Sequence, residues 1–181
     1  MKNYDNEKDK FTRGCVQVYT GNGKGKTTAS IGLAVRALGA GLRVFFAQFL
    51  KSGTYSESSI LGGLNNLTYR QYGTGQFIMR KPTEEDRVAA RAGIEDAREA
   101  LRSGAYDVVI LDEANVACSL GLIAEDDLLT VASERPERTE LVFTGRGAPP
   151  RLIEIADLVT EMREVKHYYR QGIAARKGIE S

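Results

Sequence analysis

A glycine-rich segment with two lysines and two adjacent threonines, residues 20–28 (TGNGKGKTT), is the part of the sequence best suited to chemistry. Its glycines allow backbone N–H groups to converge on phosphate oxygens, and the Lys26 ammonium adds a mobile positive charge. The hydroxyl of Thr27 follows at the position that ligates a nucleotide-bound Mg²⁺. These features predict a Walker A phosphate-binding loop, although Thr20 stands where the generic pattern has its first glycine. The alternative, a glycine-rich turn before a helix, does not explain the lysine and the threonine.

A pair of acids, Asp112 and Glu113, ends the apolar run VVILDE. A buried strand that ends in acids places them at the carboxyl edge of a parallel sheet, where ligands gather. Together with the phosphate loop, the pattern predicts a Walker B element, in which an acid holds or orients Mg²⁺ directly or through water. The sequence leaves open which of the two acids contacts the metal. Acids that merely cap a strand in solvent are the alternative.

Several other side chains could belong to the same site. Arg146, in the sequence TGRG, follows another apolar run and could reach an anionic ligand, or it could be a surface arginine in a turn. Gln48 and Lys51, near the end of a further run, could face the site or the solvent. We expect Cys118 to be a small buried hydrophobic residue rather than a nucleophile. His167 lacks an Asp or Ser at motif spacing, so we expect a surface or packing role for it.

The elements that must position these residues alternate along the chain. Apolar runs predict strands at residues 16–20, 42–50, 67–72, 107–113, 140–145 and 158–162. Helical spacing predicts helices after the phosphate loop, at 83–102 with Thr83 as the N-cap, near 125–134 and near 150–156. Strands alternating with helices predict an α/β fold, with a mostly parallel sheet of five to six strands and helices on both faces. We expect a polar leader at residues 1–13 and one domain at 14–181.

The composition excludes several classes of protein. The chain has 181 residues, with 25 Lys and Arg against 24 Asp and Glu, and 42% of its residues are hydrophobic. The hydrophobic content and the mixed charge exclude a disordered or fibrous chain. The near-zero net charge excludes a broadly basic protein that coats nucleic acid or an anionic membrane. The apolar segment 29–50 contains Arg36 and Arg43, which argues against a membrane span. We expect a soluble, cytoplasmic protein with neither a nucleic-acid nor a membrane partner.

These motifs, in this order, resemble those of the P-loop ATP:cob(I)alamin (corrinoid) adenosyltransferases, and the resemblance covers residues 14–180. The loop TGNGKGKTT is similar to that family's version, including Thr20. QFLKSG, YGTG and VVILDE also match. The phosphate loop is common to many nucleotide-binding proteins, so TGRG and the tail VKHYYRQGIAARKGIE make the match specific.

The resemblance implies a RecA-like P-loop fold, usually a homodimer, that transfers the 5′-deoxyadenosyl group of ATP to the Co(I) of a reduced corrinoid. The products would be adenosylcobalamin, or another adenosylcorrinoid, and triphosphate. Because Co(I) is itself the nucleophile, no general base is needed. The co-substrate would be MgATP, with Mn²⁺ as a metal that could replace Mg²⁺, and an electron donor such as a flavoprotein would supply the reduced cobalt.

The resemblance also assigns roles to residues of this sequence. Lys26, Thr27 and Glu113 would form the catalytic machinery. Thr27 and Glu113, with Asp112 as a further candidate, would serve Mg²⁺, and Arg146 would meet phosphate or ribose. The remaining residues assigned to nucleotide binding all lie in the loop: Thr20, Gly21, Asn22, Gly23, Lys24, Gly25 and Thr28.

One segment departs from the family. Its better-known bacterial members carry a Phe and a Trp just after GTG, which help to keep the lower face of the cobalt free of a ligand. Here Gln76, Phe77 and Ile78 follow, and the chain has no Trp. Phe77 could substitute for the missing aromatic residue.

Two other functions remain as alternatives. A P-loop ATPase or phosphotransferase would release ADP rather than triphosphate. A nucleotide-dependent binding module would show negligible turnover. The TGRG and tail matches, and the absence of an obvious general base, favour adenosyl transfer over both.

The leader provides a first testable prediction, because N-terminal segments act as lids over the corrinoid in some members of the family. We predict that deleting residues 1–13 raises the corrinoid KM in steady-state kinetics. An unchanged corrinoid KM would contradict the lid hypothesis.

Overall fold

Six parallel strands form one sheet in this computed structural model, which describes residues 12–53, 55–75 and 81–180. The strand order across the sheet is β3-β2-β4-β5-β1-β6, and each neighbouring pair is parallel. The expected α/β fold with a largely parallel sheet is therefore confirmed. The strands are β1 (Val16–Thr20), β2 (Val44–Phe49), β3 (Leu67–Tyr72), β4 (Val108–Asp112), β5 (Glu140–Thr144) and β6 (Leu158–Glu161).

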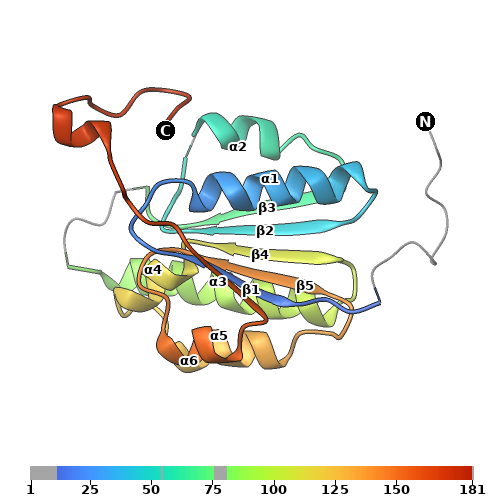
Figure 1. The fold of residues 1–181 in the computed structure, drawn as a ribbon. Helices are drawn as coiled ribbons and strands as arrows, with labels where there is room; N and C mark the ends of the chain where they lie inside the picture. The colour runs from blue at the N-terminus through green and yellow to red at the C-terminus, as the bar shows by residue number, and fades with distance from the viewer. Residues whose placement is uncertain (1–11, 54, 76–80, 181) are drawn as a thin grey trace.

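Helices cover both faces of the sheet (Figure 1). On one face lie α1 (Lys26–Gly39) and α2 (Ser56–Leu61), and on the other lie α3 (Glu84–Arg102), α4 (Ala114–Ser119), α5 (Glu125–Ser133) and α6 (Pro150–Ile155). Alternate residues of β2 enter separate cores: Phe45 packs on the α3 side, whereas Phe46 packs on the α1 side. Two-sided burial explains why β2 and β4 are continuous apolar runs rather than alternating patterns.

The long helix α3 begins and packs as its sequence predicts. The Thr83 side chain accepts a hydrogen bond from the Asp86 N–H, and the Asp86 carboxylate accepts one from the Thr83 N–H (2.8 Å), which completes a capping box. Its expected apolar stripe, Ala90, Ile94, Ala97 and Leu101, is buried.

Some boundaries and short elements differ from the expectations. The predicted strand at 42–50 is shorter at both ends, and Leu50 ends it in a left-handed conformation with φ 64°. The helices α2 and α4 and a 3₁₀ helix at Tyr168–Gln171 were not predicted, because one or two turns are too short to show a helical period. The predicted roles of Gln76, Phe77 and Ile78, and residues 1–11 of the leader, lie outside the described residues.

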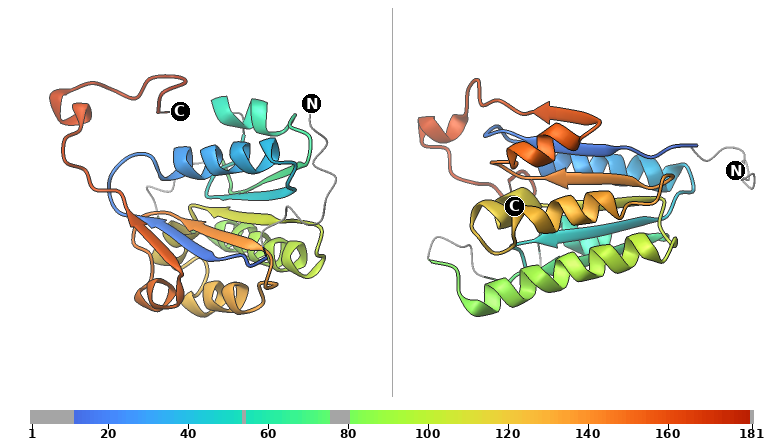
Figure 2. Two further views of the ribbon diagram at one scale, coloured as in Figure 1. Left: turned by 45° about the vertical axis from the view of Figure 1, so that its right-hand side comes forward. Right: turned by 90° about the horizontal axis from the view of Figure 1, so that it is seen from below.

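The topology brings the predicted site residues to one edge of the sheet. Since every strand runs in the same direction, the segments after β1, β2, β4 and β5 all leave at the carboxyl edge, on the left in Figure 1. The two views of Figure 2 show the same arrangement, with β1 and β5 side by side. The phosphate loop, Lys51, the acid pair and TGRG thus meet at a single edge.

The packing of α3 on the sheet generates a stability prediction. A Cβ atom at Gly93 would lie 2.8 Å from Phe49 Cε1 and 2.8 Å from Tyr72 Cγ, so we expect Gly93→Ala to lower the free energy of unfolding by about 1–2 kcal/mol in urea denaturation. Gly32, which is exposed in α1, is the matched control, because a Cβ atom there would have no neighbour within 4 Å. Gly32→Ala should raise stability by about 0.5–1 kcal/mol. Equal effects at the two sites would contradict this description of the α3 contact.

Candidate active site

The phosphate loop is a tight turn between β1 and α1. Gly21 (φ 92°) and Gly25 (φ 119°) are left-handed, a conformation that side chains rarely adopt. Gly23 donates its N–H to the Met162 carbonyl (2.6 Å), and a Cβ there would lie 2.7 Å from the same oxygen. The loop therefore packs directly against the backbone that follows β6, and only glycine fits that approach.

Thr20, the departure from the generic loop, is explained by its position. It is the last residue of β1, so its backbone is extended and does not require glycine. Its hydroxyl accepts a hydrogen bond from the Ala148 N–H (3.3 Å), which ties the start of the phosphate loop to the segment after TGRG.

Lys26 lies in the centre of the loop. Its ammonium donates to the carbonyls of Gly21 (2.7 Å) and Gly23 (2.8 Å), and the residue is only 6% exposed. Burial lowers the pKa of Lys26, and the negative charge of Glu113 opposes that shift. The loop thus encloses a largely buried cation that is hydrogen-bonded to the loop's own carbonyls.

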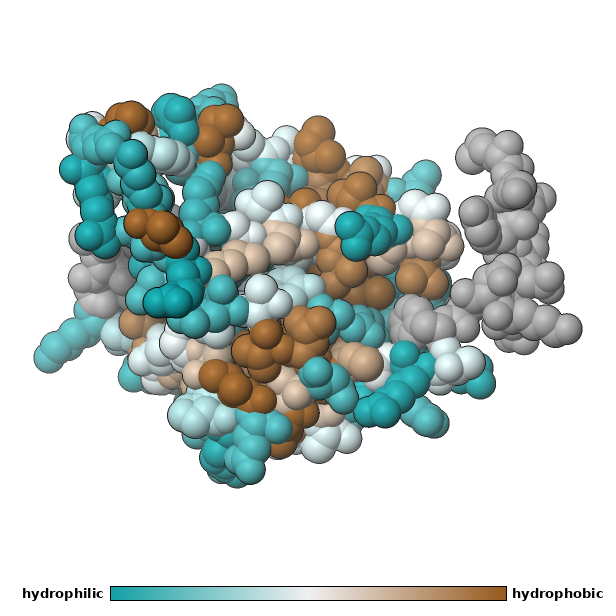
Figure 3. Space-filling model, viewed as in Figure 1, coloured by the Kyte–Doolittle hydropathy of each residue, from teal (hydrophilic) through white to brown (hydrophobic). Residues whose placement is uncertain are grey.

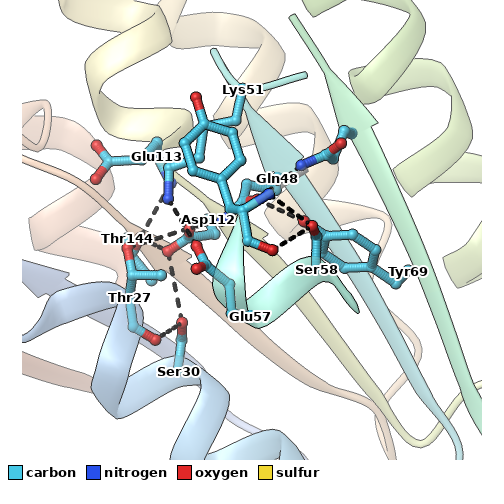
Figure 4. A network of polar contacts seen from close by, with 12 residues as sticks. Thr27, Ser30, Gln48, Lys51, Glu57, Ser58, Tyr69, Asp112, Glu113 and Thr144 are labelled. Atoms are coloured by element: carbon cyan, nitrogen blue, oxygen red, sulfur yellow. Dashed lines mark hydrogen bonds and ion pairs between the residues drawn. The ribbon is translucent and has the colours of Figure 1, made fainter. Parts of the chain in front are cut away.

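Asp112 is a fully buried carboxylate with four side-chain donors around it (Figure 4). One oxygen, Oδ1, accepts from the Thr144 hydroxyl (2.7 Å), and the Ser30 hydroxyl lies 3.5 Å from it while making a shorter contact with the Thr27 carbonyl (2.9 Å). The other, Oδ2, accepts from Gln48 Nε2 (3.1 Å) and the Thr27 hydroxyl (3.2 Å). Both oxygens of Asp112 are therefore hydrogen-bonded to the protein.

Glu113 has a different environment, although it is the next residue. Its backbone is left-handed (φ 62°), and its N–H donates to the Thr144 hydroxyl (3.0 Å). Its carboxylate makes no hydrogen bond or ion pair with the described residues, and in Figure 4 it points away from the cluster around Asp112. Burial raises the pKa of Glu113, and the charge of Asp112 adds to that shift. Of the two acids, Glu113 is the one with free acceptor atoms.

Arg146 extends from the TGRG turn on the same edge. Gly145 before it is left-handed (φ 129°) and close to α4, since a Cβ there would lie 3.0 Å from the Val116 nitrogen. The Arg146 side chain is exposed and makes no hydrogen bond or ion pair with the described part of the chain. After burial, its positive charge adds to the lowering of the Lys26 pKa, and it opposes the raising of the Glu113 pKa.

Lys24 contacts the C-terminal segment rather than the rest of the loop. Its ammonium donates to the Ile179 carbonyl (2.6 Å) and lies 3.8 Å from the Glu180 carboxylate. Glu180 also accepts hydrogen bonds from Tyr168 and Arg176. The surface of this segment is mainly hydrophilic (Figure 3), so polar contacts like these hold it near the loop.

Asn22 and Thr28, the remaining loop residues with polar side chains, are exposed. Asn22 lines a polar cavity of about 250 Å³ together with Glu161, Arg163, Glu164 and Arg170. Thr28 lies in the first turn of α1.

Gln48 and Lys51, which the sequence left open between site and solvent, have separate surroundings. Gln48 is fully buried and hydrogen-bonded to Asp112. Lys51 forms an ion pair with Glu57 (3.2 Å) and lies over the Tyr55 ring. Of the two positions that the sequence left open for Gln48, the structure shows the one at the site, beside Asp112. Sequence reasoning missed Ser30 and Thr144, which also lie beside Asp112.

Other candidate chemistry is weak in the described residues. His167 is half-buried and accepts a hydrogen bond from the Tyr169 N–H. Cys118 is also half-buried and packs against the core, and burial raises the pKa of its thiol. Over the ranges described, no group of three or more His, Cys, Asp or Glu residues could hold a metal ion, so a metal on Thr27 and Glu113 would need other ligands, such as phosphate oxygens. Among the helices of the described residues, none is both long enough and apolar enough to span a membrane.

Comparison with known proteins finds extensive similarity. Residues 12–181 match the family model described as ATP:corrinoid adenosyltransferase BtuR/CobO/CobP. A corrinoid adenosyltransferase of Pseudomonas aeruginosa is 38% identical over 170 residues, which cover 93% of this chain and 84% of the relative. Corrinoid adenosyltransferases of Escherichia coli K12 and Salmonella typhimurium are 35% and 34% identical, and each alignment covers 93% of this chain and 86% of the relative.

The contrast between the two acids predicts opposite effects of neutral substitutions. Asp112→Asn replaces an acceptor with an NH₂ group that faces donors, so we expect it to lower the free energy of unfolding by about 1–3 kcal/mol. Glu113→Gln should instead raise the Tm of the nucleotide-free protein at neutral pH, because the raised pKa of Glu113 means that folding disfavours its charged form.

The pH dependence of the Tm difference between Glu113→Gln and the wild type tests the sign of this predicted increase. Above the pKa that Glu113 has in the folded protein, the wild-type carboxylate is charged in the folded and the unfolded state and destabilises the folded state. The Tm increase caused by the substitution is therefore largest in that pH range. As the pH falls through the folded pKa toward the unfolded value of about 4.3, Glu113 becomes protonated and the gain should disappear. Thermal unfolding between pH 4 and pH 8 measures this, and a gain that grew at low pH would contradict the assignment.

Proposed function

Because the chain belongs to the ATP:corrinoid adenosyltransferase family, we propose that it transfers the 5′-deoxyadenosyl group of ATP to the Co(I) of a reduced corrinoid at the edge that carries the phosphate loop. The observation that carries this site assignment is the Lys26 ammonium, buried in a glycine loop at the start of α1. The negative charge of the Glu113 carboxylate raises the pKa of Lys26 and so opposes the effect of burial.

The chemistry needs a site that stabilises a leaving group. Co(I) attacks the 5′ carbon, a Co–C bond forms, and the bond from that carbon to the phosphate oxygen breaks. Triphosphate departs with the electron pair and with growing negative charge. The loop N–H groups and Lys26 would bind that charge and stabilise it in the transition state. The cobalt supplies the nucleophilic electron pair, so the protein needs to orient the reactants but not to remove a proton.

We assign the metal contact to Glu113 and Thr27 rather than to Asp112. Both oxygens of Asp112 already accept hydrogen bonds, from Thr27, Gln48 and Thr144, whereas the Glu113 carboxylate has free lone pairs. The Thr27 hydroxyl donates its hydrogen to Asp112, which leaves its oxygen lone pairs for a cation. Bound Mg²⁺, or Mn²⁺ in its place, would neutralise part of the triphosphate charge.

Two more cations would meet the nucleotide. Arg146 is exposed near Lys26 and could reach a phosphate or the ribose, since its guanidinium has no other partner among the described residues. Lys24 would exchange the Ile179 carbonyl and the Glu180 carboxylate for phosphate oxygens. The Lys24 side chain is exposed and lies 3.8 Å from the Glu180 carboxylate, a long ion pair.

The family resemblance supports three further proposals. The protein would act as a homodimer in the cytoplasm, and an electron donor such as a flavoprotein would reduce the corrinoid. The leader at residues 1–13 would close over the corrinoid bound to the domain at 14–181.

Product analysis tests the function directly. The protein is incubated with MgATP and chemically reduced corrinoid, and the products are identified. Adenosylcorrinoid and triphosphate in equal amounts are expected. ADP without alkylated cobalt would instead identify an ATPase or phosphotransferase, and the absence of any turnover would identify a binding module.

The role of Lys26 yields a separate prediction. We expect Lys26→Ala to lower the rate of adenosyl transfer about 100-fold or more, because the mutant lacks a cation that stabilises the departing triphosphate. The rate is measured from the absorbance change of the corrinoid at saturating MgATP. Arg102→Ala, which removes an exposed cation paired with Glu134 at the end of α3, should leave the rate unchanged. Near-full activity in Lys26→Ala would contradict the assigned role.

A further inference from the structure

Gln48 is a fully buried amide near the carboxyl end of β2. Its Nε2 donates to Asp112 Oδ2 (3.1 Å), and its Oε1 accepts from the Tyr69 hydroxyl (2.6 Å) and from Gln71 Nε2 (3.4 Å). Figure 4 shows Gln48 between Asp112 on one side and Tyr69 on the other. The amide thus links three neighbouring strands, β4, β2 and β3.

The orientation of this amide is determined by the carboxylate. If the amide were flipped, its oxygen would face the carboxylate of Asp112, and two acceptors would then meet in a buried place. In the observed orientation, the NH₂ group faces Asp112, and Oε1 accepts from two side chains of β3. The Tyr69 hydroxyl, at 2.6 Å, holds the far end of the amide in place while Gln48 presents a donor to the acid.

Gln48 affects Thr27 because both side chains donate to the same carboxylate oxygen of Asp112. Asp112 Oδ2 accepts from only two side chains among the described residues, Gln48 and Thr27. The terminal torsion of an aspartate is soft, so a carboxylate that lost one of these donors could rotate. Rotation would move the acceptor that holds the Thr27 hydroxyl.

We propose that Gln48 is a positioning residue for the metal, held in place by Tyr69: it fixes the Asp112 carboxylate so that the Thr27 oxygen presents its lone pairs to the nucleotide-bound cation. The inference rests on the proposed metal role of Thr27. It adds two residues, on β2 and β3, that touch neither the metal nor the nucleotide. Outer partners of this kind typically change metal affinity by about 10–100-fold when they are removed.

The chain contains a matched control on the other side of the molecule. Gln17 repeats the same three-residue arrangement: its Nε2 donates to the Glu140 carboxylate, and its Oε1 accepts from the Tyr19 hydroxyl (2.5 Å). Glu140 is the first residue of β5, whereas Asp112 is the last residue of β4. Because the strands are parallel, the Gln17 arrangement lies at the edge of the sheet opposite to the phosphate loop.

The experiment measures ATP binding without corrinoid, so that no turnover occurs. Isothermal titration gives the Kd of ATP with Mg²⁺ and with EDTA, and the quantity of interest is the ratio of the EDTA value to the Mg²⁺ value. Gln48→Met keeps the length of the side chain but removes the donor, and we expect it to lower the ratio about 10-fold. Tyr69→Phe, which removes only the hydroxyl, should lower the ratio by a smaller factor. Gln17→Met should leave the ratio at the wild-type value.

Each alternative outcome overturns the inference in a recognisable way. An unchanged ratio in Gln48→Met and Tyr69→Phe would show that Gln48 does not act on the metal. An equal fall in Gln17→Met would show that the loss is a general effect of destabilisation. Should Gln48→Met fail to fold, Tyr69→Phe carries the test alone, with an unchanged ratio counting against the proposal. A wild-type ratio of one would remove the metal role of Thr27 itself, and positioning by Gln48 with it.

Discussion

The buried carboxylate of Asp112 is the constraint on which the arrangement of this site depends. A buried carboxylate must receive hydrogen bonds from the protein, and here the donors come from α1, β2 and β5. Thr27 on α1 can donate to it only if the helix begins directly after the phosphate loop. The same requirement therefore fixes the start of α1, the end of β4 and the end of β5 relative to one another.

The strand order makes this convergence possible. β4 lies between β2 and β5 in the sheet, so the last residue of β4 is flanked by side chains from strands that are distant in the sequence. β1, which leads into the phosphate loop, pairs with the other side of β5. Parallel strands then place all four carboxyl ends on one edge, and the loop faces the acids across the end of β5.

The sequence predicted the elements that carry local signals and missed those that depend on neighbours. Apolar runs predicted the central strands, and glycine spacing with a lysine predicted the phosphate loop, because these are properties of a few consecutive residues. The environment of Gln48 depends on which strands flank β2, and no local pattern encodes that order. The same applies to Lys24, whose partners Ile179 and Glu180 lie at the other end of the chain. A short helix such as α4 is missed for a different reason, since six residues show no period.

The difference between the two acids also comes from the backbone. In a strand, successive side chains point to opposite faces, and Asp112, as the last strand residue, faces the donors of α1 and β2. Glu113 leaves the strand in a left-handed conformation, which costs roughly 1 kcal/mol or more for a residue other than glycine. The Thr144 hydroxyl offsets part of this cost, since it accepts the Glu113 N–H while donating to Asp112. One threonine thus stabilises both the backbone turn that frees the Glu113 carboxylate and the hydrogen bonds that occupy Asp112.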